Sequence, residues 1–495
     1  MTEEQVDGIR SRLSAIVTNH QTCYDGLVVA KSGILRSRLD GTEAALSAPE
    51  IFNVRRLYSV SSGLVTQALI STNSTHHRHH HHHHHHHQHH HNHRKRDNVK
   101  GGGLPPATPP SQNVKGGSGN RLPPAAVAPV NLHRQPLEQF IKALKSTNCN
   151  SSSSKSCPRE GQIQLGMEGS GILIRDIVIV SKDGTGNFTT IRDAVANLPN
   201  NTRPEDGYFV IYVKQGIYEE IIDISRYKKN IMLLGDGINR TVITGNLNAG
   251  DGQLHTFYTA TFAVSGDRFI AIDITFRNTA GPTKGQAVAV RNQADLSAFY
   301  RCSLEGYQDT LYAHSRRQFY RECDIYGNVD FIFGDAAAVF QNCNIFVRNT
   351  RNHKTNYITA QGREDPDSNT GISIHNCTVD VAPDSATSRR TRTYLGRPWQ
   401  LYSRTVYMQS YIGSLVAPAG WSKWNNGNTG LDTLYYGEFE NYGPGANTRR
   451  RVRWPGFSLM SDSEALNFTV SNFTTGWSWL PDTDIPFSAG LIETT

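Results

Sequence analysis

The chain has 495 residues, more than one hydrophobic core usually organises, so two or more domains are expected. Charged residues make up 19% of it and hydrophobic residues 37%, and no run of 18 or more apolar residues predicts a membrane-spanning helix. The formal net charge is +7, which favours an anionic partner. Nucleic acid is not the expected partner, because neither an aromatic-flanked RNA motif nor zinc-finger spacing accompanies the basic residues.

Residues 1–72 are expected to be helical, because Ile9, Leu13, Ile16 and Val17 recur at helical spacing and a similar stretch follows. Two or three helices of this length cannot close a core by themselves. The first residues, MTEEQVDGIRSRL, contain no apolar stretch like that of a signal peptide, so no signal peptide is predicted.

Low-complexity sequence over residues 73–175 predicts a linker without a packed core. It contains 15 histidines between His76 and His93, then Gly- and Pro-rich sequence, then a serine run. The histidines could bind transition metals, but their irregular interruption is typical of natural low complexity, and repeats give no fixed coordination geometry. No specific metal site is therefore expected, and the folded domain is expected over residues 176–495.

Short apolar runs bounded by Gly, Asn and Asp predict many strands after residue 176, and four cysteines mark a repeat among them. The steps from Cys302 to Cys323 and from Cys323 to Cys343 are 21 and 20 residues, and the longer step to Cys377 fits a coil with an inserted loop. This period suits one coil of a right-handed parallel β-helix. A β-sandwich is the alternative, but it would not require such self-similarity. The sequence thus predicts an all-β domain of this kind, preceded by a short helical segment.

The repeat brings two acidic residues together. Asp309 and Asp330 each lie seven residues after a repeat cysteine, so they should stack one coil apart, with carboxylates within about 4–6 Å. Two carboxylates that close do not both ionise readily: the pKa of one rises, and a nearby cation holds the other ionised. The pair therefore predicts a division of roles between acid and base or nucleophile.

Neighbouring residues supply the other groups that such a pair needs. Gln308 precedes the first Asp and Gln286 lies one coil earlier, and their amides could form an oxyanion hole for acyl transfer. Arg397 could hold one Asp ionised through a bidentate contact, and Trp399 could stack on a sugar ring. Without a pocket, each Gln alone is more often a structural residue.

Seven cysteines leave at least one thiol unpaired. The stacking that joins the aspartates also brings Cys323 within disulfide range of both Cys302 and Cys343, so spacing alone does not choose a bond. Eight N-x-S/T sequons give weak support for secretion, which conflicts with the missing signal peptide.

At these residues the chain resembles the plant pectin methylesterases, over about 176 to 495. The resemblance is carried by Gly306–Tyr312 (GYQDTLY), Asp330–Gly334 (DFIFG), Leu395–Trp399 (LGRPW), Val180–Phe188 (VSKDGTGNF) and Trp479–Pro481 (WLP). It implies a right-handed parallel β-helix that hydrolyses the methyl esters of homogalacturonan to polygalacturonate and methanol, with no metal or other cofactor.

The resemblance also implies roles for single residues. Asp330 matches the nucleophile, Asp309 the proton donor and then base, and Gln308 the stabiliser of the transition state. Four positions match substrate contacts: Thr256, Gln286, Arg397 and Trp399. In the family pattern the disulfide is Cys323–Cys343. A secreted, monomeric enzyme of the cell wall is implied, with pectinesterase inhibitor proteins as further partners.

The first 72 residues resemble the end of the pectinesterase-inhibitor domain, through a stretch from Leu13 to Gly26 and the helix after it. The front half of that four-helix bundle is absent from the sequence, including the usual partner of Cys23. A smaller departure is Gly285, where the family often has His, which would alter a subsite.

Three rival functions are weaker. A polysaccharide lyase or galacturonan hydrolase would share the fold, and carboxylates about 5 Å apart also suit a retaining glycosidase, but the expected hydrolase motifs and the calcium-binding acidic cluster are not found. An inactive carbohydrate-binding protein is disfavoured by the complete set of candidate groups. Serine esterase chemistry is disfavoured because the sequence contains no G-x-S-x-G motif.

Overall fold

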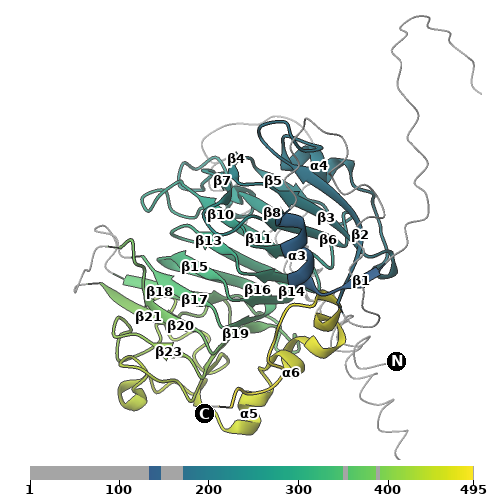
Figure 1. Cartoon of the computed structure of the whole chain (residues 1–495). Helices are drawn as coiled ribbons and strands as arrows, with labels where there is room; N and C mark the ends of the chain where they lie inside the picture. The colour runs from purple at the N-terminus through teal and green to yellow at the C-terminus, as the bar shows by residue number, and fades with distance from the viewer. Residues whose placement is uncertain (1–132, 147–170, 349–354, 386–390, 494–495) are drawn as a thin grey trace, which may run out of the picture.

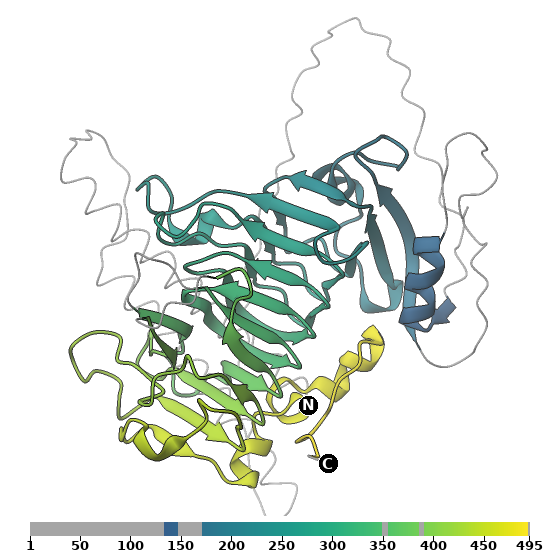
Figure 2. The same ribbon diagram turned by 60° about the vertical axis from the view of Figure 1, so that its left-hand side comes forward.

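The computed structural model describes residues 133–146, 171–348, 355–385 and 391–493. Over these residues the chain winds into a parallel β-helix, which confirms the fold predicted from the repeat (Figures 1 and 2). Each complete coil contributes strands to three parallel walls. The predicted helical segment 1–72 lies outside the described residues, so the domain limits proposed for it stay a prediction.

The first wall consists of β2 (Ile172–Val180), β3 (Tyr208–Val213), β6 (Ile231–Gly235), β9 (Ile270–Ile272), β12 (Ser297–Tyr300), the later part of β14 (Leu311–Arg321) and of β16 (Val329–Gln341), β19 (Gly371–His375), β22 (Arg404–Met408), β24 (Tyr435–Phe439) and β25 (Phe457–Leu459). The second wall consists of β4 (Gly216–Glu219), β7 (Thr241–Gly245), β10 (Thr275–Asn278), β13 (Ser303–Glu305), β15 (Asp324–Gly327), β17 (Asn344–Val347), β20 (Thr378–Val381) and β23 (Tyr411–Ile412).

The third wall consists of β5 (Ile222–Ile224), β8 (Phe262–Val264), β11 (Val290–Asn292), the early parts of β14 and β16, β18 (Thr355–Gln361) and β21 (Arg392–Gly396). Strands β14 and β16 are long enough to pass from the third wall into the first, so these two walls form one 17-stranded sheet. The active-site candidates lie where these two strands begin.

The interior is filled by residues that repeat from coil to coil. Aromatic rings stack along it, with ring centroids 5.2 Å apart for Phe299 and Tyr320 and 4.5 Å apart for Tyr320 and Phe340. Helix α4 (Ile191–Asn197) begins at Thr190, whose side chain accepts a hydrogen bond from the Asp193 N–H, and its buried face packs against β2, β3 and β5. The helix therefore covers the N-terminal end of the stack (Figure 1).

The four repeat cysteines occupy one corner of successive coils, as the spacing predicts. Each follows a residue of positive φ, and the Cys323 N–H donates to Cys343 Sγ at 3.4 Å while the Cys343 N–H donates to Cys377 Sγ at 3.3 Å. All four are free thiols, so the Cys323–Cys343 disulfide implied by the resemblance is not formed in this structure. Stacked in-register positions point their Cβ atoms in parallel, about 4.8 Å apart, which is wider than a disulfide favours.

One part of the predicted linker is folded. Strand β1 (His133–Gln135) pairs antiparallel with β2, and helix α3 (Leu137–Ser146) packs on the outside of the first wall. The linker prediction rested on the composition of the whole segment and overlooked a short run of apolar residues at helical spacing. These residues form the buried face of α3: Leu137, Phe140, Ile141 and Leu144. The polar contacts of the helix are Leu137 N to Asp484 Oδ2 (2.7 Å), Lys145 Nζ to Asp273 Oδ2 (2.7 Å) and Arg301 Nη1 to Glu138 Oε1 (2.6 Å). Strand β2 also begins at Ile172, before residue 176.

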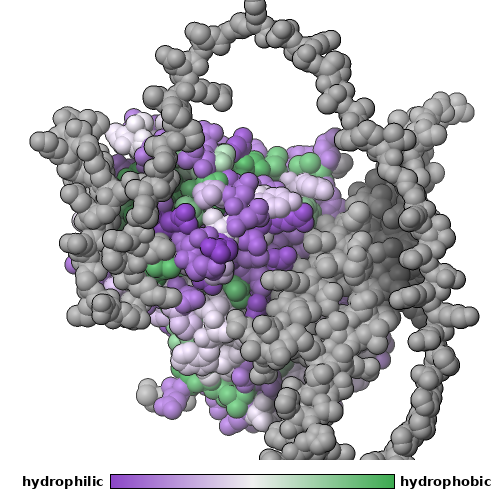
Figure 3. Space-filling view, turned by 90° about the vertical axis from the view of Figure 1, so that its right-hand side faces the viewer, coloured by the Kyte–Doolittle hydropathy of each residue, from purple (hydrophilic) through white to green (hydrophobic). Residues whose placement is uncertain are grey.

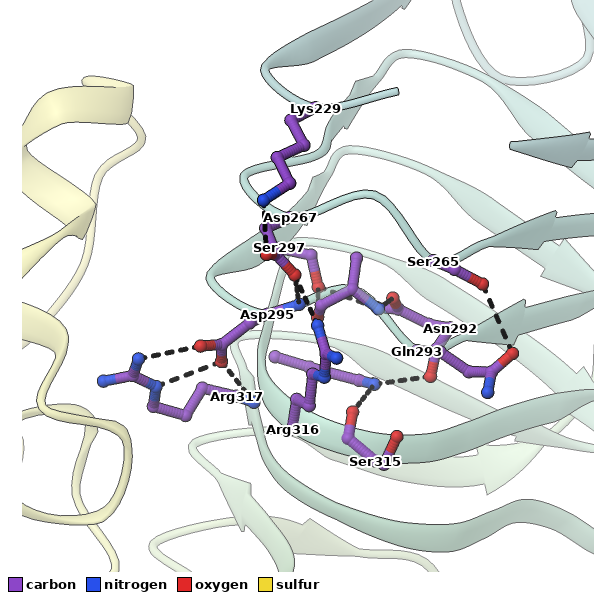
Figure 4. A network of polar contacts seen from close by, with 12 residues as sticks. Lys229, Ser265, Asp267, Asn292, Gln293, Asp295, Ser297, Ser315, Arg316 and Arg317 are labelled. Atoms are coloured by element: carbon purple, nitrogen blue, oxygen red, sulfur yellow. Dashed lines mark hydrogen bonds and ion pairs between the residues drawn. The ribbon is translucent and has the colours of Figure 1, made fainter. Parts of the chain in front are cut away.

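The C-terminal segment, with α5 (Asp462–Leu466) and α6 (Val470–Thr474), lies along the same side of the stack as α3 (Figure 1). Beside it lies a polar network of the coils that contains Asp295 and Arg317 (Figure 4). Arg317 donates two hydrogen bonds to Asp295, at 3.1 and 2.8 Å, and a third to Thr475 at 3.0 Å. Asp295 and Arg317 are both buried, so this ion pair fixes the segment after α6 against the first wall.

The surface seen in Figure 3 is mostly hydrophilic among the described residues, with small, separate hydrophobic areas. Nowhere in the described ranges is a helix both long and apolar enough to span a bilayer. The same residues contain no group of three or more His, Cys, Asp or Glu side chains placed to hold a metal ion.

Candidate active site

The two aspartates lie where the chain enters the third wall in consecutive coils. Asp309 precedes β14, and Asp330 is the second residue of β16. The Asp309 N–H donates to the Val329 carbonyl at 3.0 Å, which fixes the two turns against each other. Both residues have positive φ, +62° and +50°, a conformation that recurs at other corners of the coils. The stacking predicted from the sequence is therefore found.

Arg397 binds one member of the pair. It follows β21 and donates to Asp330 from Nε at 2.8 Å and from Nη2 at 2.5 Å, a bidentate contact. Its guanidinium lies between two aromatic rings, 4.0 Å from the centroid of Tyr357 and 4.3 Å from that of Trp424. Arg397 thus has little freedom to turn away from Asp330.

Burial and charge separate the two carboxyl groups. Burial raises the pKa of Asp309 well above its usual range, and the charge of Asp330 raises it further, against the opposing effect of Arg397. Burial also raises the pKa of Asp330, but its hydrogen bonds and charge interaction with Arg397 act in the opposite direction. The pair can therefore hold a proton on Asp309 and a negative charge on Asp330.

Two glutamine amides lie beside the pair. Gln286 and Gln308 form a parallel β-bridge, and the Ala287 N–H donates to the Gln308 carbonyl at 3.1 Å. Both side chains are half-buried. Within the described part of the chain neither side-chain amide has a hydrogen-bond partner, so both are free to donate to a ligand.

An apolar floor extends from the aspartates along the outside of the third wall. Tyr312 stacks on Phe333 with centroids 4.2 Å apart, and Trp399 contacts both rings, at 6.4 and 6.0 Å. Trp399 can approach because residue 362 is Gly: a Cβ there would lie 2.7 Å from the Trp399 ring. Phe257 packs against the same cluster, and its neighbour Thr256 begins the 3₁₀ helix η2 (Thr256–Thr259).

The structure thus groups Asp309, Asp330, Gln308 and Arg397 closely, with Gln286 in the adjoining coil. Thr256 and Trp399 are linked to this group through the apolar floor. Sequence reasoning missed Tyr357 and Trp424, which hold Arg397. Nothing in their sequence neighbourhood points to that contact, although Trp424 is 39% exposed and is one of few tryptophans in the chain.

Two buried carboxyl groups lie on the outer wall of the parallel β-helix, and their surroundings favour the protonated form of Asp309 and the ionised form of Asp330. Such a pair defines an acid–base enzyme, and its binding surface runs across the coils.

Comparison with known proteins identifies the family of this enzyme. A family model described as Pectinesterase matches residues 177–477. The Arabidopsis thaliana protein "Probable pectinesterase/pectinesterase inhibitor 25" is 52% identical over 497 residues, which cover 100% of this chain and 71% of that protein. Pectinesterase 2 of Citrus sinensis is 55% identical over 316 residues, 63% of this chain and 60% of that protein.

Solved structures agree. The pectin methylesterase from carrot superposes with a TM-score of 0.61 and 48% identity, covering 66% of this chain and 100% of that one. A pectin methylesterase in complex with a hexasaccharide gives a TM-score of 0.51 at 28% identity, covering 61% and 97%. The chain therefore belongs to the pectinesterase family, and it is an enzyme that removes methyl esters from pectin.

Proposed function

We propose that this chain hydrolyses the methyl esters of homogalacturonan through an acyl-enzyme on Asp330. The observation that carries this proposal is the bidentate contact of Arg397 with Asp330 beside the buried Asp309, whose pKa is raised by burial and by the charge of Asp330. The ionised Asp330 attacks the ester carbonyl carbon, and Asp309 gives its proton to the departing methoxy oxygen, which leaves as methanol.

In the second step Asp309, now ionised, takes a proton from water as the water oxygen attacks the acyl carbon. The bond to Asp330 breaks, which releases the galacturonate carboxyl group and restores both starting protonation states. Both steps pass through an oxyanion. Gln308 stabilises it, with help from Gln286, because their amides have donors to spare at this point.

The substrate is a stretch of polymer rather than a single sugar. Thr256 and Trp399 contact sugar units on either side of the reacting one, and the apolar floor around Tyr312 and Phe333 supports the sugar faces. The hexasaccharide complex of a related enzyme supports this length of site. The net charge of +7 favours an acidic polymer.

The expected location and processing of the enzyme follow from its relatives. We expect a glycosylated, monomeric enzyme secreted to the cell wall. We also expect that residues 1–72 derive from an inhibitor-like domain, because relatives matching 100% of this chain carry "pectinesterase inhibitor" in their names. Inhibitor proteins of that kind are the expected protein partners.

The test is to measure methanol and new reducing ends when the full chain acts on methylated pectin. Methanol without chain cleavage is expected, and unsaturated products or new reducing ends would instead assign a lyase or hydrolase. Asp330→Asn should abolish methanol release in a chain that still folds, because the substitution keeps the shape of the side chain and removes the charge that faces Arg397. Turnover retained in that variant would refute the nucleophile assignment.

A further inference from the structure

A row of side chains crosses the outer face of the third wall, one from each coil. Tyr312, Phe333 and Ala263 point outward into the apolar floor, whereas their neighbours Leu311, Ile332 and Phe262 face the interior. The strand register places Arg291 in the same row, between Ala263 on β8 and Tyr312 on β14. A cation therefore lies in this row, in the same coil as Gln286.

Arg291 is an unusual cation, since it is only 5% exposed. Its Nη2 lies 3.4 Å from Asp223, whose side chain is 66% exposed, and its Nε and Nη1 have no hydrogen-bond partner. Burial lowers its pKa accordingly. The close contact that remains is the ring of Phe257, whose centroid is 3.5 Å from the guanidinium carbon. Such a contact stabilises a desolvated cation more strongly than an exposed one.

Phe257 is the second residue of η2 and follows Thr256 directly. Its ring is enclosed on other sides by His314 at 5.6 Å and Tyr258 at 5.1 Å, both edge to face. The far end of η2 is fixed separately, because the Thr259 hydroxyl accepts from the Val288 N–H at 3.1 Å. At the start of η2, His255 Nδ1 accepts from the Phe257 N–H at 3.4 Å, and the Phe257 ring is the side-chain contact that holds this end against the third wall.

We propose that Arg291 is a positioning residue for substrate binding: it clamps the Phe257 ring and thereby sets Thr256 at the rim of the binding surface. This rests on the proposed role of Thr256 as a substrate contact. Arg291 touches neither the reacting ester nor the aspartates. Its effect should fall on binding of the polymer, not on the chemical step.

The test is a double-mutant cycle on methylated pectin. Arg291→Met and Phe257→Leu should each raise KM about tenfold and leave kcat within about twofold, and the double variant should be no worse than either single one. Arg291→Lys keeps a cation over the ring and should recover part of the loss. The inference would be overturned if the KM of the double variant rose by the product of the two single increases. It would also be overturned if kcat fell while KM stayed unchanged.

Arg268→Met is the matched control. Arg268 is also poorly exposed, has an unpaired Nε and lies 5.6 Å from the Tyr208 ring, but it is placed at the opposite corner of its coil, beside Asp482. Arg268→Met should leave KM unchanged, because Arg268 does not contact Phe257. An equal rise of KM in both variants would mean that general destabilisation, and not the clamp, is responsible.

Hydrogen exchange separates this inference from the proposed function. In Arg291→Met the amide of Tyr258 should exchange faster, while those of Thr261 and Val264 further along should not change, because Thr261 donates to the Val288 carbonyl at the separately fixed end. If the wild-type chain releases no methanol, the proposed function fails, but exchange still decides whether the clamp exists. Unchanged exchange at Tyr258 refutes the clamp whatever the activity.

Discussion

Replacing Arg397 by Gln isolates what the arginine does for Asp330. The change removes both charge-assisted hydrogen bonds from a carboxylate that is 5% exposed and leaves its burial in place. Breaking one side of a buried pair costs about 3–5 kcal/mol. The pKa of Asp330 should therefore rise, because its burial then acts without the opposing charge and hydrogen bonds of Arg397. Because the nucleophile must be ionised, the acid limb of kcat/KM should move to higher pH.

The assay is methanol release followed as a function of pH. The matched control is Arg451→Gln, because Arg451 makes a bidentate contact with Glu438, at 2.8 and 3.0 Å, in a buried pair remote from the aspartates. It should lose stability and keep the position of the acid limb. An acid limb that stays in place in Arg397→Gln would refute the account of how Asp330 remains charged.

Three other predictions concern stability and substrate binding. Asp309→Asn should abolish turnover but raise the thermal midpoint at neutral pH. The pKa of Asp309 is higher in the folded than in the unfolded chain, so its burial costs stability once the pH rises above the unfolded pKa. Calorimetry should therefore show that the stability gained by the substitution disappears in acid, where the carboxyl group is protonated in both states. A gain that persists in acid would contradict this. Phe140→Ala on α3 should reduce unfolding free energy by about 3 kcal/mol without changing kcat/KM, and an unchanged denaturant midpoint would show that the helix does not dock. Gly362→Ala should displace the Trp399 ring, raising KM and altering tryptophan emission, whereas wild-type values for both would argue against the close approach.

The cysteine spacing was enough to predict the fold and the stacked aspartates, because coils of equal length keep equivalent residues in register. Arg397 was predicted from chemistry and resemblance, but its aromatic neighbours were not. Tyr357 reaches Arg397 from β18, and Trp424 reaches it from the loop between β23 and β24, to which the period of the repeat does not extend. Contacts between unequal coils are set by loop paths that a repeat does not specify.

Helix α3 shows a second reason for failure. Composition averaged over residues 73–175 hides ten residues with one apolar face, and that face is buried only because the outer side of the first wall lies next to it. The cysteines show a third reason. Equal spacing predicts that two cysteines lie close together, but a disulfide also needs Cβ atoms that approach each other. In stacked corners the Cα–Cβ bonds stay parallel, and the four cysteines are free thiols in this structure.

The position of β14 and β16 in the array has a consequence for how the molecule comes apart. In a linear stack each coil contacts only its neighbours, so unfolding can start at either end and proceed inward. These two strands lie near the middle and belong to two walls at once, so opening them breaks two ladders together. The catalytic coils should therefore be the last to open. Structure at the ends of the stack would be lost on heating before activity is, and the unfolding of this enzyme should not be two-state.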